Sequence, residues 1–250
     1  MSNPTKSRVA VITGASRGLG ETLARFLAGQ GYNLILNARG GAALDSVVRS
    51  LASYNVEVKA IAGDVSEPST RRAIVDLARR LGGLDILINN ASILGASPLV
   101  PLADHPLNAL ERVYRANVIA PLALVQEALP LLKASHGLIV NVSSDAALGG
   151  YATWGGYGSS KAALDLISKT LANELKASAV AVVSVDPGEM RTQMQQESQP
   201  TGDISGYPAP DVTLPFWAWL FGQDRMAVSG GRYQAQSEQW EAANASENAS

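Results

Sequence analysis

The stretch VAVITGASRGLG, at residues 9–20, constrains the fold more than any other part of the chain. Its first five residues are apolar or β-branched, as in a short strand that is buried on both faces of a sheet. Three glycines follow, and then apolar residues recur at the three- and four-residue spacing of an amphipathic helix, at Leu19, Leu23, Phe26 and Leu27. A strand, a glycine turn and a helix together place backbone N–H groups where a phosphate can bind.

Each glycine has its own expected part in this turn. Gly14 permits the tight turn, Gly18 the close approach of a pyrophosphate, and Gly20 the packing of the helix on the strand. A glycine-rich turn without any ligand has the same appearance. The remainder of the chain has to decide between the two interpretations.

Strand-like and helix-like segments alternate after the first unit. The pattern predicts strands over 32–37, 56–61, 84–88, 137–142 and 180–185, and helices over 42–54, 67–81, 107–134 and 156–177, with a kink at Pro121. This alternation predicts an α/β fold with a single, doubly wound parallel sheet flanked by helices on both faces. We expect one domain over residues 7–235, a short edge strand at 228–234, and a polar, mobile tail over 236–250.

Composition excludes several classes of function. A net charge of −2 gives no electrostatic footprint for nucleic acid or an anionic membrane. The chain has no cysteine, and its two histidines, His105 and His136, lie far apart, so no metal site is predicted. The N-terminus lacks the apolar core of a signal peptide, and no apolar run approaches the ~20 residues of a membrane span. We therefore expect a cytoplasmic protein.

Polar or turn residues follow most of the predicted strands. In a parallel sheet these positions share one edge, where ligands bind beyond the carboxyl ends. We expect a ligand crevice there, lined by Arg39, Asp64, Asn89–Ala91, Ser143–Ser144 and Pro187–Gly188.

Tyr157 and Lys161 lie four residues apart at the start of a predicted helix, so they share one face of it. An ammonium group near a phenol favours the phenolate, which predicts a lowered pKa for Tyr157 and a tunable acid/base. The hydroxyl of Ser144, at the end of a strand, is placed to hydrogen-bond a substrate oxygen. Asn117 is unusual inside a helix, which allows a special role or a solvent-facing side chain.

Taken together, these motifs resemble the short-chain dehydrogenase/reductase superfamily. They are Thr13-Gly14-x-x-x-Gly18-x-Gly20, Asn89-Asn90-Ala91, Asn117, Ser144, Tyr157-x-x-x-Lys161 and Pro187-Gly188-x-x-x-Thr192, and the resemblance covers about residues 7–235. It implies a Rossmann-type fold and NAD(P)(H). It further implies that Tyr157 is the acid/base, that Ser144 orients the carbonyl, and that Lys161 binds the nicotinamide ribose and lowers the pKa of Tyr157. Asn117 would hold a water that connects Lys161 to solvent.

The resemblance also implies a set of cofactor contacts. Asp64 would contact the adenine, Asn90 a ribose, and Gly188 and Thr192 the nicotinamide end. The expected cofactor-binding residues are Gly14, Ser16, Arg17, Gly18, Leu19, Gly20, Arg39, Asp64, Val65, Asn90, Ala91, Tyr157, Lys161, Pro187, Gly188 and Thr192.

The second predicted strand ends without the carboxylate that usually binds the ribose 2′-OH of NAD. Arg39 follows that strand instead, and Arg17 lies in the glycine turn. Guanidinium groups match phosphate oxygens, so the pair predicts NADP(H). The alternative is that Arg17 and Arg39 are solvated surface residues that bind no phosphate.

The chain departs from the family pattern at three places. Ser92 stands where Asn-Asn-Ala usually continues to glycine, and Glu189 stands where an apolar residue is more frequent. Glu189 is expected either in solvent or facing the nicotinamide end or the substrate. The frequent late Asp-Gly-Gly is absent.

The predicted activity is an NADP(H)-dependent interconversion of a carbonyl and an alcohol. Alternatives are a non-catalytic NADP(H)-binding regulator or scaffold, and an epimerase or dehydratase of nucleotide sugars. The family resemblance implies a homodimer or homotetramer, often formed through the helices at 107–134 and 156–177.

An apolar or aromatic substrate is expected from the residues of three variable segments. The segment at 215–221, PFWAWLF, is expected to be a short helix packed on the rest of the domain, part of a mobile lid over the crevice within 193–221, or both. The expected substrate-facing residues are Leu94, Leu148, Tyr151, Trp154, Phe216 and Trp217.

Overall fold

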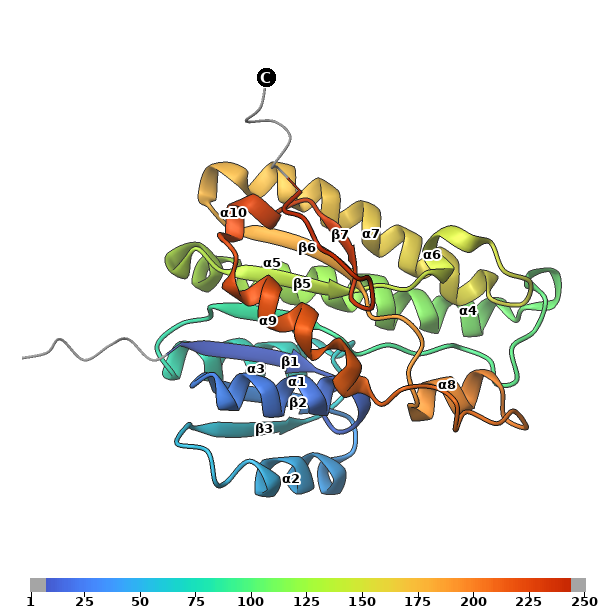
Figure 1. The fold of residues 1–250 in the computed structure, drawn as a ribbon, viewed down its shortest axis with the longest axis horizontal. Helices are drawn as coiled ribbons and strands as arrows, with labels where there is room; N and C mark the ends of the chain where they lie inside the picture. Colours follow the sequence, from blue (N-terminus) through green and yellow to red (C-terminus); the bar gives the residue numbers. More distant parts are fainter. Residues whose placement is uncertain (1–7, 244–250) are drawn as a thin grey trace, which may run out of the picture.

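A computed structural model of the chain describes residues 8–243 and contains one seven-stranded, fully parallel sheet (Figure 1). The strand order is β3-β2-β1-β4-β5-β6-β7, which confirms the predicted doubly wound sheet. The strands are β1 (Val9–Thr13), β2 (Asn33–Ala38), β3 (Val58–Ala62), β4 (Ile86–Asn89), β5 (Leu138–Val142), β6 (Ala181–Asp186) and β7 (Arg232–Gln234). Most begin or end within two residues of the predicted bounds.

The direction of winding reverses between β1 and β4, which are hydrogen-bonded neighbours. Every residue of β1, β4, β5 and β6 is buried, as their mostly apolar sequences favour in a sheet covered on both faces. The crevice at such a reversal point is where open α/β sheets bind ligands.

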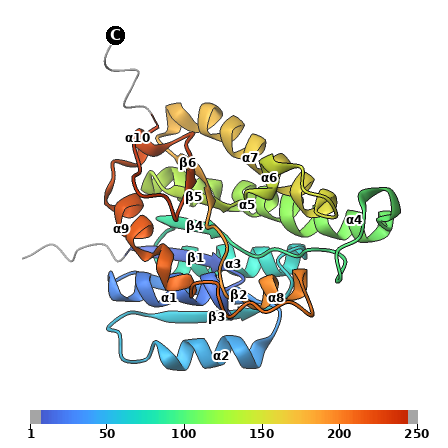
Figure 2. The ribbon, with the colours of Figure 1, turned by 45° about the vertical axis from the view of Figure 1, so that its right-hand side comes forward.

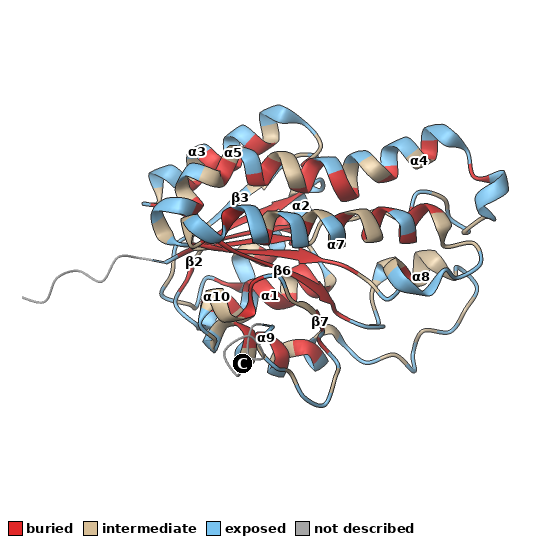
Figure 3. Ribbon diagram, turned by 90° about the horizontal axis from the view of Figure 1, so that it is seen from above, coloured by how far each residue is buried: buried red, intermediate tan, exposed pale blue. Residues whose placement is uncertain are grey.

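Helices cover both faces of the sheet, as Figure 3 shows from above. One face packs mainly against α3 (Pro68–Arg80), α5 (Ala120–Ser135) and α7 (Gly155–Leu175), and the other against α1 (Gly18–Gly29), α2 (Gly41–Ser50) and α9 (Leu214–Gly222). The remaining helices are α4 (Leu107–Tyr114), α6 (Ala146–Gly149), α8 (Gln193–Ser198) and α10 (Arg225–Val228), with single turns at η1 (Leu102–Asp104), η3 (Lys176–Ser178) and η4 (Pro210–Thr213).

The predicted long helix at 107–134 contains a π-helical turn, η2 (Arg115–Ile119), between α4 and α5, and Pro121 lies in the first turn of α5. The chain stays helical throughout 107–135. Pro121 lacks the N–H that the carbonyl of Asn117, four residues earlier, would otherwise accept, so the irregularity lies next to the proline that predicts it. By length and composition, Leu107–Ser135 is the one segment within residues 8–243 that could cross a membrane. Here it packs against α3 and α7.

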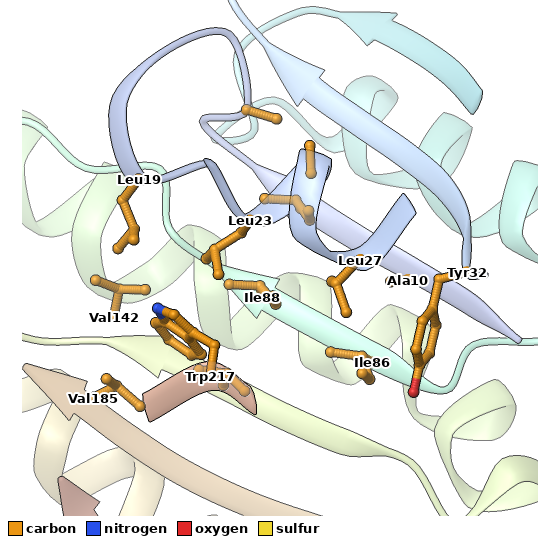
Figure 4. Packing of buried hydrophobic residues seen from close by; sticks show 14 of the residues in the cluster. Ala10, Leu19, Leu23, Leu27, Tyr32, Ile86, Ile88, Val142, Val185 and Trp217 are labelled. Carbon is orange, nitrogen blue, oxygen red and sulfur yellow. The ribbon is translucent and has the colours of Figure 1, made fainter. Parts of the chain in front are cut away.

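The PFWAWLF segment forms α9, and the lid interpretation is wrong for this part of 193–221. Phe216 and Trp217 are fully buried, and Trp217 lies among Leu23, Val142 and Val185 of the core (Figure 4). Two aromatic side chains on one short helix bury more apolar area against the sheet than a mobile lid would. α8 is the part of 193–221 that lies beyond the carboxyl ends of the strands (Figure 2).

The last described residues, from α10 onwards, pair with the sheet and pack against the rest of the domain. Helix α10 occupies 225–228, so the edge strand β7 starts later than predicted, and it pairs with β6. Gln236 Nε2 donates to the carbonyls of Pro187 and Glu189, both at 2.9 Å, and Trp240 packs against Phe216. Position 7 of the predicted domain and positions 244–250 of the predicted tail lie outside the described residues.

Candidate active site

Two cavities meet beyond the carboxyl ends of the central strands. The larger, of about 840 Å³, is lined by the glycine turn after β1 and by the ends of β2, β4 and β5. The smaller, of about 580 Å³, lies beside it against α6, the 151–154 turn and the 186–190 segment. Tyr157, Ser143 and Pro187 line both cavities. We refer to the two as the larger cavity and the smaller cavity.

The glycine turn has the conformation that the sequence predicts. Gly14 has φ of +66°, which favours glycine. A Cβ atom at Gly20 would lie 2.4 Å from the carbonyl oxygen of Gly14, so only glycine allows α1 to approach the turn this closely. The resulting cradle of backbone at a helix N-terminus fits a pyrophosphate.

Thr13 and Asn90 fix this turn against the end of β4. Thr13 Oγ1 accepts the backbone N–H groups of Asn90 and Ala91, each at 3.0 Å. The amide of Asn90 donates to the carbonyls of Thr13 at 2.9 Å and Gly14 at 3.1 Å. The amide expected to contact a ribose is therefore already used to hold the glycine turn, although Asn90 also lines the larger cavity.

The structure gathers nearly all of the expected cofactor residues around one space. Gly20 lies behind the turn, and Gly188 lines the smaller cavity. The larger cavity is lined by Gly14, Ser16, Arg17, Gly18, Leu19, Arg39, Asp64, Val65, Asn90, Ala91, Tyr157, Lys161, Pro187 and Thr192.

Arg17 and Arg39 are both exposed on the wall of the larger cavity. Arg17 Nη1 hydrogen-bonds Gln193 Oε1, which links the glycine turn to α8. Arg112 and Arg115 line the same cavity, and we did not predict them. Their only signal in the sequence was proximity to Asn117 on the same helical segment. Within residues 8–243, no carboxylate stands directly after β2 beside Arg39.

Tyr157 and Lys161 lie in the first two turns of α7 and are buried. Lys161 Nζ donates to the carbonyl of Val142 at 2.7 Å and lies 5.5 Å from the centroid of the Tyr157 ring. The Trp154 ring contacts the Tyr157 ring edge-on, with the centroids 5.8 Å apart. The two side chains therefore share one face at the junction of the cavities, as their spacing predicts.

Burial has the largest effect on the pKa values of Tyr157 and Lys161. It raises the pKa of Tyr157 above its usual value, and the negative charges of Asp186 and Asp145 add to the rise. The hydroxyls of Ser144 and Ser92 act in the opposite direction and lower the pKa of Tyr157. Burial lowers the pKa of Lys161 to about 8. The expectation that Lys161 leaves Tyr157 with a lowered pKa is wrong for this structure, because loss of hydration penalises the phenolate more.

Asn117 lies in the π-helical turn and is buried rather than solvent-facing. Its Oδ1 accepts the N–H of Ile93 at 2.9 Å, and its Nδ2 donates to the carbonyl of Ile93 at 2.9 Å and to Ser160 Oγ at 3.0 Å. The side chain is therefore fully engaged in joining η2 to the segment after β4 and to α7.

Ser144 lines the smaller cavity, next to Tyr157. Its Oγ donates to Asp145 Oδ1 at 3.0 Å, and its carbonyl accepts a hydrogen bond of 2.8 Å from Arg232 Nη2 on β7. Arg232 also donates through Nε to Asp165 Oδ2 at 2.9 Å and lies 3.8 Å from Asp186 Oδ2. We did not predict a role for Arg232, since nothing local in the sequence connects it to Ser144.

The smaller cavity has aromatic, apolar and acidic walls. Leu94, Tyr151 and Trp154 line it as expected, together with Met190 and Met194. The expectation is wrong for Phe216 and Trp217, which are core residues, and Leu148 is exposed outside both cavities.

Three carboxylates also line the smaller cavity, at Asp145, Asp186 and Glu189. Glu189 is exposed at its edge, which places this departure from the family pattern on the substrate side. Burial raises the pKa of Asp186, while the N–H of Gly188 and the charge of Arg232 lower it. Among residues 8–243, no three His, Cys, Asp or Glu side chains are grouped to hold a metal ion.

Comparison with known proteins agrees with this geometry. Residues 8–203 match the family model of short chain dehydrogenases. The chain is 37% identical to an L-xylo-3-hexulose reductase of Hypocrea jecorina, over 92% of this chain and 82% of the relative.

Two solved structures superpose closely on the fold. A short chain dehydrogenase from Pseudomonas syringae has a TM-score of 0.86 at 34% identity, covering 92% of this chain and 95% of that one. A short chain dehydrogenase from Shigella flexneri, solved in complex with NADP, has a TM-score of 0.83 at 30% identity, covering 92% and 97%. The protein thus belongs to the short-chain dehydrogenase/reductase superfamily of nicotinamide-dependent oxidoreductases.

Proposed function

We propose that the protein is an NADP(H)-dependent oxidoreductase that interconverts a ketone or aldehyde and its alcohol, with Tyr157 as the acid/base. One observation carries this proposal. The Tyr157 phenol lies where a cavity with a phosphate-binding turn meets a second, partly apolar cavity. A proton-transferring group at that junction can reach a carbonyl oxygen held against a nicotinamide ring.

NADP(H) suits the larger cavity better than NAD(H). Arg17 and Arg39 offer guanidinium groups near the end of β2, where an acid that would bind a free ribose 2′-OH is missing. The Shigella flexneri relative was solved with NADP. Ser143 Oγ is buried, has no hydrogen-bond partner among the described residues and lines both cavities, as a group that awaits a ligand would. When bound, the nicotinamide supplies or accepts the hydride.

Side chains of the protein would carry out the proton transfer. In reduction, Tyr157 donates its proton to the developing alkoxide, and a raised pKa keeps the phenol protonated at neutral pH for that step. Ser144, whose hydroxyl donates to Asp145 Oδ1 in this structure, would turn to donate to the same oxygen and polarise the carbonyl. Lys161 binds the ribose, and Asn117 fixes the backbone around both groups and supports a water path to Lys161.

The substrate that fits best is neutral, with an apolar or aromatic body. Trp154, Tyr151 and Met194 provide contact area in the smaller cavity. The carboxylates of Asp145, Asp186 and Glu189 would repel a phosphorylated or carboxylated substrate.

We also propose that the chain acts as one cytoplasmic domain within a homodimer or homotetramer. Leu107, Ile119 and Leu166 are large apolar side chains exposed on α4, η2 and α7, which suits burial against a second copy. Size-exclusion chromatography with light scattering tests this assignment, and a monomer at micromolar concentration would contradict it.

The decisive test uses Tyr157→Phe with NADPH and a panel of benzaldehyde, acetophenone and L-xylo-3-hexulose. The variant should bind NADPH as the wild type does and lose about 10²–10⁴-fold in turnover, the range of general acid catalysis. Tyr54→Phe, in the loop after α2, is the control and should retain full activity. Retention of activity by Tyr157→Phe would refute the proposed role. Tight NADPH binding by the wild type without any turnover would instead indicate a regulator or scaffold.

A further inference from the structure

Arg71, near the start of α3, is the only arginine among residues 8–243 that is buried, with 8% of its surface exposed. A guanidinium group that loses its hydration is costly unless hydrogen bonds replace the lost water. The groups that replace this water indicate what the burial of Arg71 achieves.

Arg71 makes three hydrogen bonds, and two of them go to the loop between β3 and α3. Its Nη1 donates to the carbonyl of Val65 at 3.0 Å and to the carbonyl of Ser66 at 2.9 Å. Its Nε donates to Glu127 Oε1 on α5 at 2.9 Å, within an ion pair. Glu127 therefore balances the charge of the guanidinium group, while a different nitrogen of that group holds the backbone of the loop.

The loop that Arg71 holds is a wall of the larger cavity, which residues 64–67 line. Two other side chains fix the same loop. Asn37 Nδ2, from β2, donates to the carbonyl of Gly63 at 3.0 Å, and Asp64 Oδ1 accepts the N–H of Ser66 at 2.8 Å. The shape of this wall thus depends on side-chain hydrogen bonds, since the loop lies beyond the end of β3 and has no neighbouring strand.

This wall lies far from the Tyr157 end of the cavity. The loop follows β3, at one edge of the sheet, whereas Lys161 Nζ contacts the end of β5, and three strands lie between β3 and β5. Four strand spacings amount to about 19 Å. The phosphate-binding turn follows β1, between the two ends. With the nicotinamide at Tyr157, the adenosine half of the cofactor would lie against residues 64–67.

We propose that Arg71 is a positioning residue for the adenosine half of the cofactor, because it holds the carbonyls of Val65 and Ser66 and so fixes the wall at 64–67. This inference rests on the proposed binding of NADP(H) in the larger cavity. Without Arg71, this loop would have to be ordered when the cofactor binds, and that ordering would lower the affinity. The groups around the nicotinamide would be unaffected.

The test compares the double variant Arg71→Met/Glu127→Met with Glu127→Gln by isothermal titration. The double variant removes both charges of the pair and leaves no unpaired buried charge, which favours a folded protein. NADPH and adenosine 2′,5′-bisphosphate should each bind to it about tenfold more weakly. Glu127→Gln loses the ion pair but keeps both hydrogen bonds to the loop, and it should bind both ligands as the wild type does. Arg72→Met, at an exposed position of α3, is the control for lost charge.

Two further measurements separate positioning from a general loss of structure. Reduced nicotinamide mononucleotide, which lacks the adenosine half, should bind to the double variant as it does to the wild type. The kcat of the double variant at saturating NADPH should also be unchanged. Wild-type affinity of the double variant for NADPH and the bisphosphate would overturn the inference, as would equally weakened binding of the mononucleotide. A wild-type protein that binds NADPH without any turnover would defeat the proposed activity instead, so the two failures are distinguishable.

Discussion

The two cavities that meet at Tyr157 are built in different ways. The larger cavity is formed by residues that directly follow strands, and reciprocal hydrogen bonds between Thr13 and Asn90 lock its glycine turn to the end of β4. The smaller cavity is lined by side chains from separate segments, including Leu94, Trp154 and Met194. The backbone therefore shapes the larger cavity, on the cofactor side, and side chains shape the smaller cavity, on the substrate side. Substitutions in the smaller cavity can change the substrate without disturbing the cofactor site.

Residues 193–221 repeat this contrast within one segment. Helix α8 is polar, is capped by Thr192 Oγ1, and contributes Gln193, Met194 and Glu197 to the larger cavity. Helix α9 is apolar and lies in the core, where Trp217 packs beside Leu19 and Val142, two residues that also line the larger cavity. α9 thus supports the cavity from behind, while α8 covers it.

The largest expected effect separates a core aromatic residue from an aromatic residue of the smaller cavity. Trp217→Ala should lower the free energy of unfolding by about 3–5 kcal/mol, as for other buried aromatic truncations. Trp154→Ala, at a half-buried position, should lower it by about 1 kcal/mol and raise KM instead. Urea denaturation and steady-state kinetics of both variants measure the difference. Equal losses of stability in the two variants would contradict the assignment of Trp217 to the core and Trp154 to the smaller cavity.

A smaller effect sharpens the assignment of the larger cavity to NADP(H). Arg39→Asp should weaken NADPH binding about 10- to 100-fold, because an arginine–phosphate contact is replaced by repulsion, and should change NADH binding little. Arg49→Asp, an equal charge change on α2 outside the cavity, is the control. Isothermal titration with both nucleotides gives the comparison. Equal weakening of both would show that Arg39 does not read the 2′-phosphate.

The smallest expected effect concerns pH. Burial lowers the pKa of Lys161 to about 8, so its ammonium form is lost as the pH rises through that value. The raised pKa of Tyr157 keeps the phenol protonated over the same range. The rate of carbonyl reduction should therefore fall roughly tenfold per pH unit above pH ~8. We assign this falling limb of the pH–rate profile to deprotonation of Lys161. Lys169→Ala, on the exposed face of α7, should leave this limb in place. A flat profile up to pH ~9.5 would contradict the assignment.

Much of the fold could be predicted from the sequence because each central strand is mostly apolar and each motif is local. Tyr157 and Lys161 share a helical turn, and the glycine turn follows a strand directly. Pro121 indicates an irregular helix, but not that the irregularity is a π-helical turn at 115–119. Phe216 and Trp217 were misplaced because aromatic residues suit a core and a substrate pocket equally well. Arg232 escaped notice because its partner Ser144 is distant in sequence.

The hydrogen bond between Arg232 and the carbonyl of Ser144 also sets an order of events during synthesis. The strand that carries Arg232 leaves the ribosome 88 residues after Ser144 does. The carbonyl of Ser144, at the edge of the smaller cavity, therefore gains this hydrogen bond only once β7 has joined β6 at the end of the sheet.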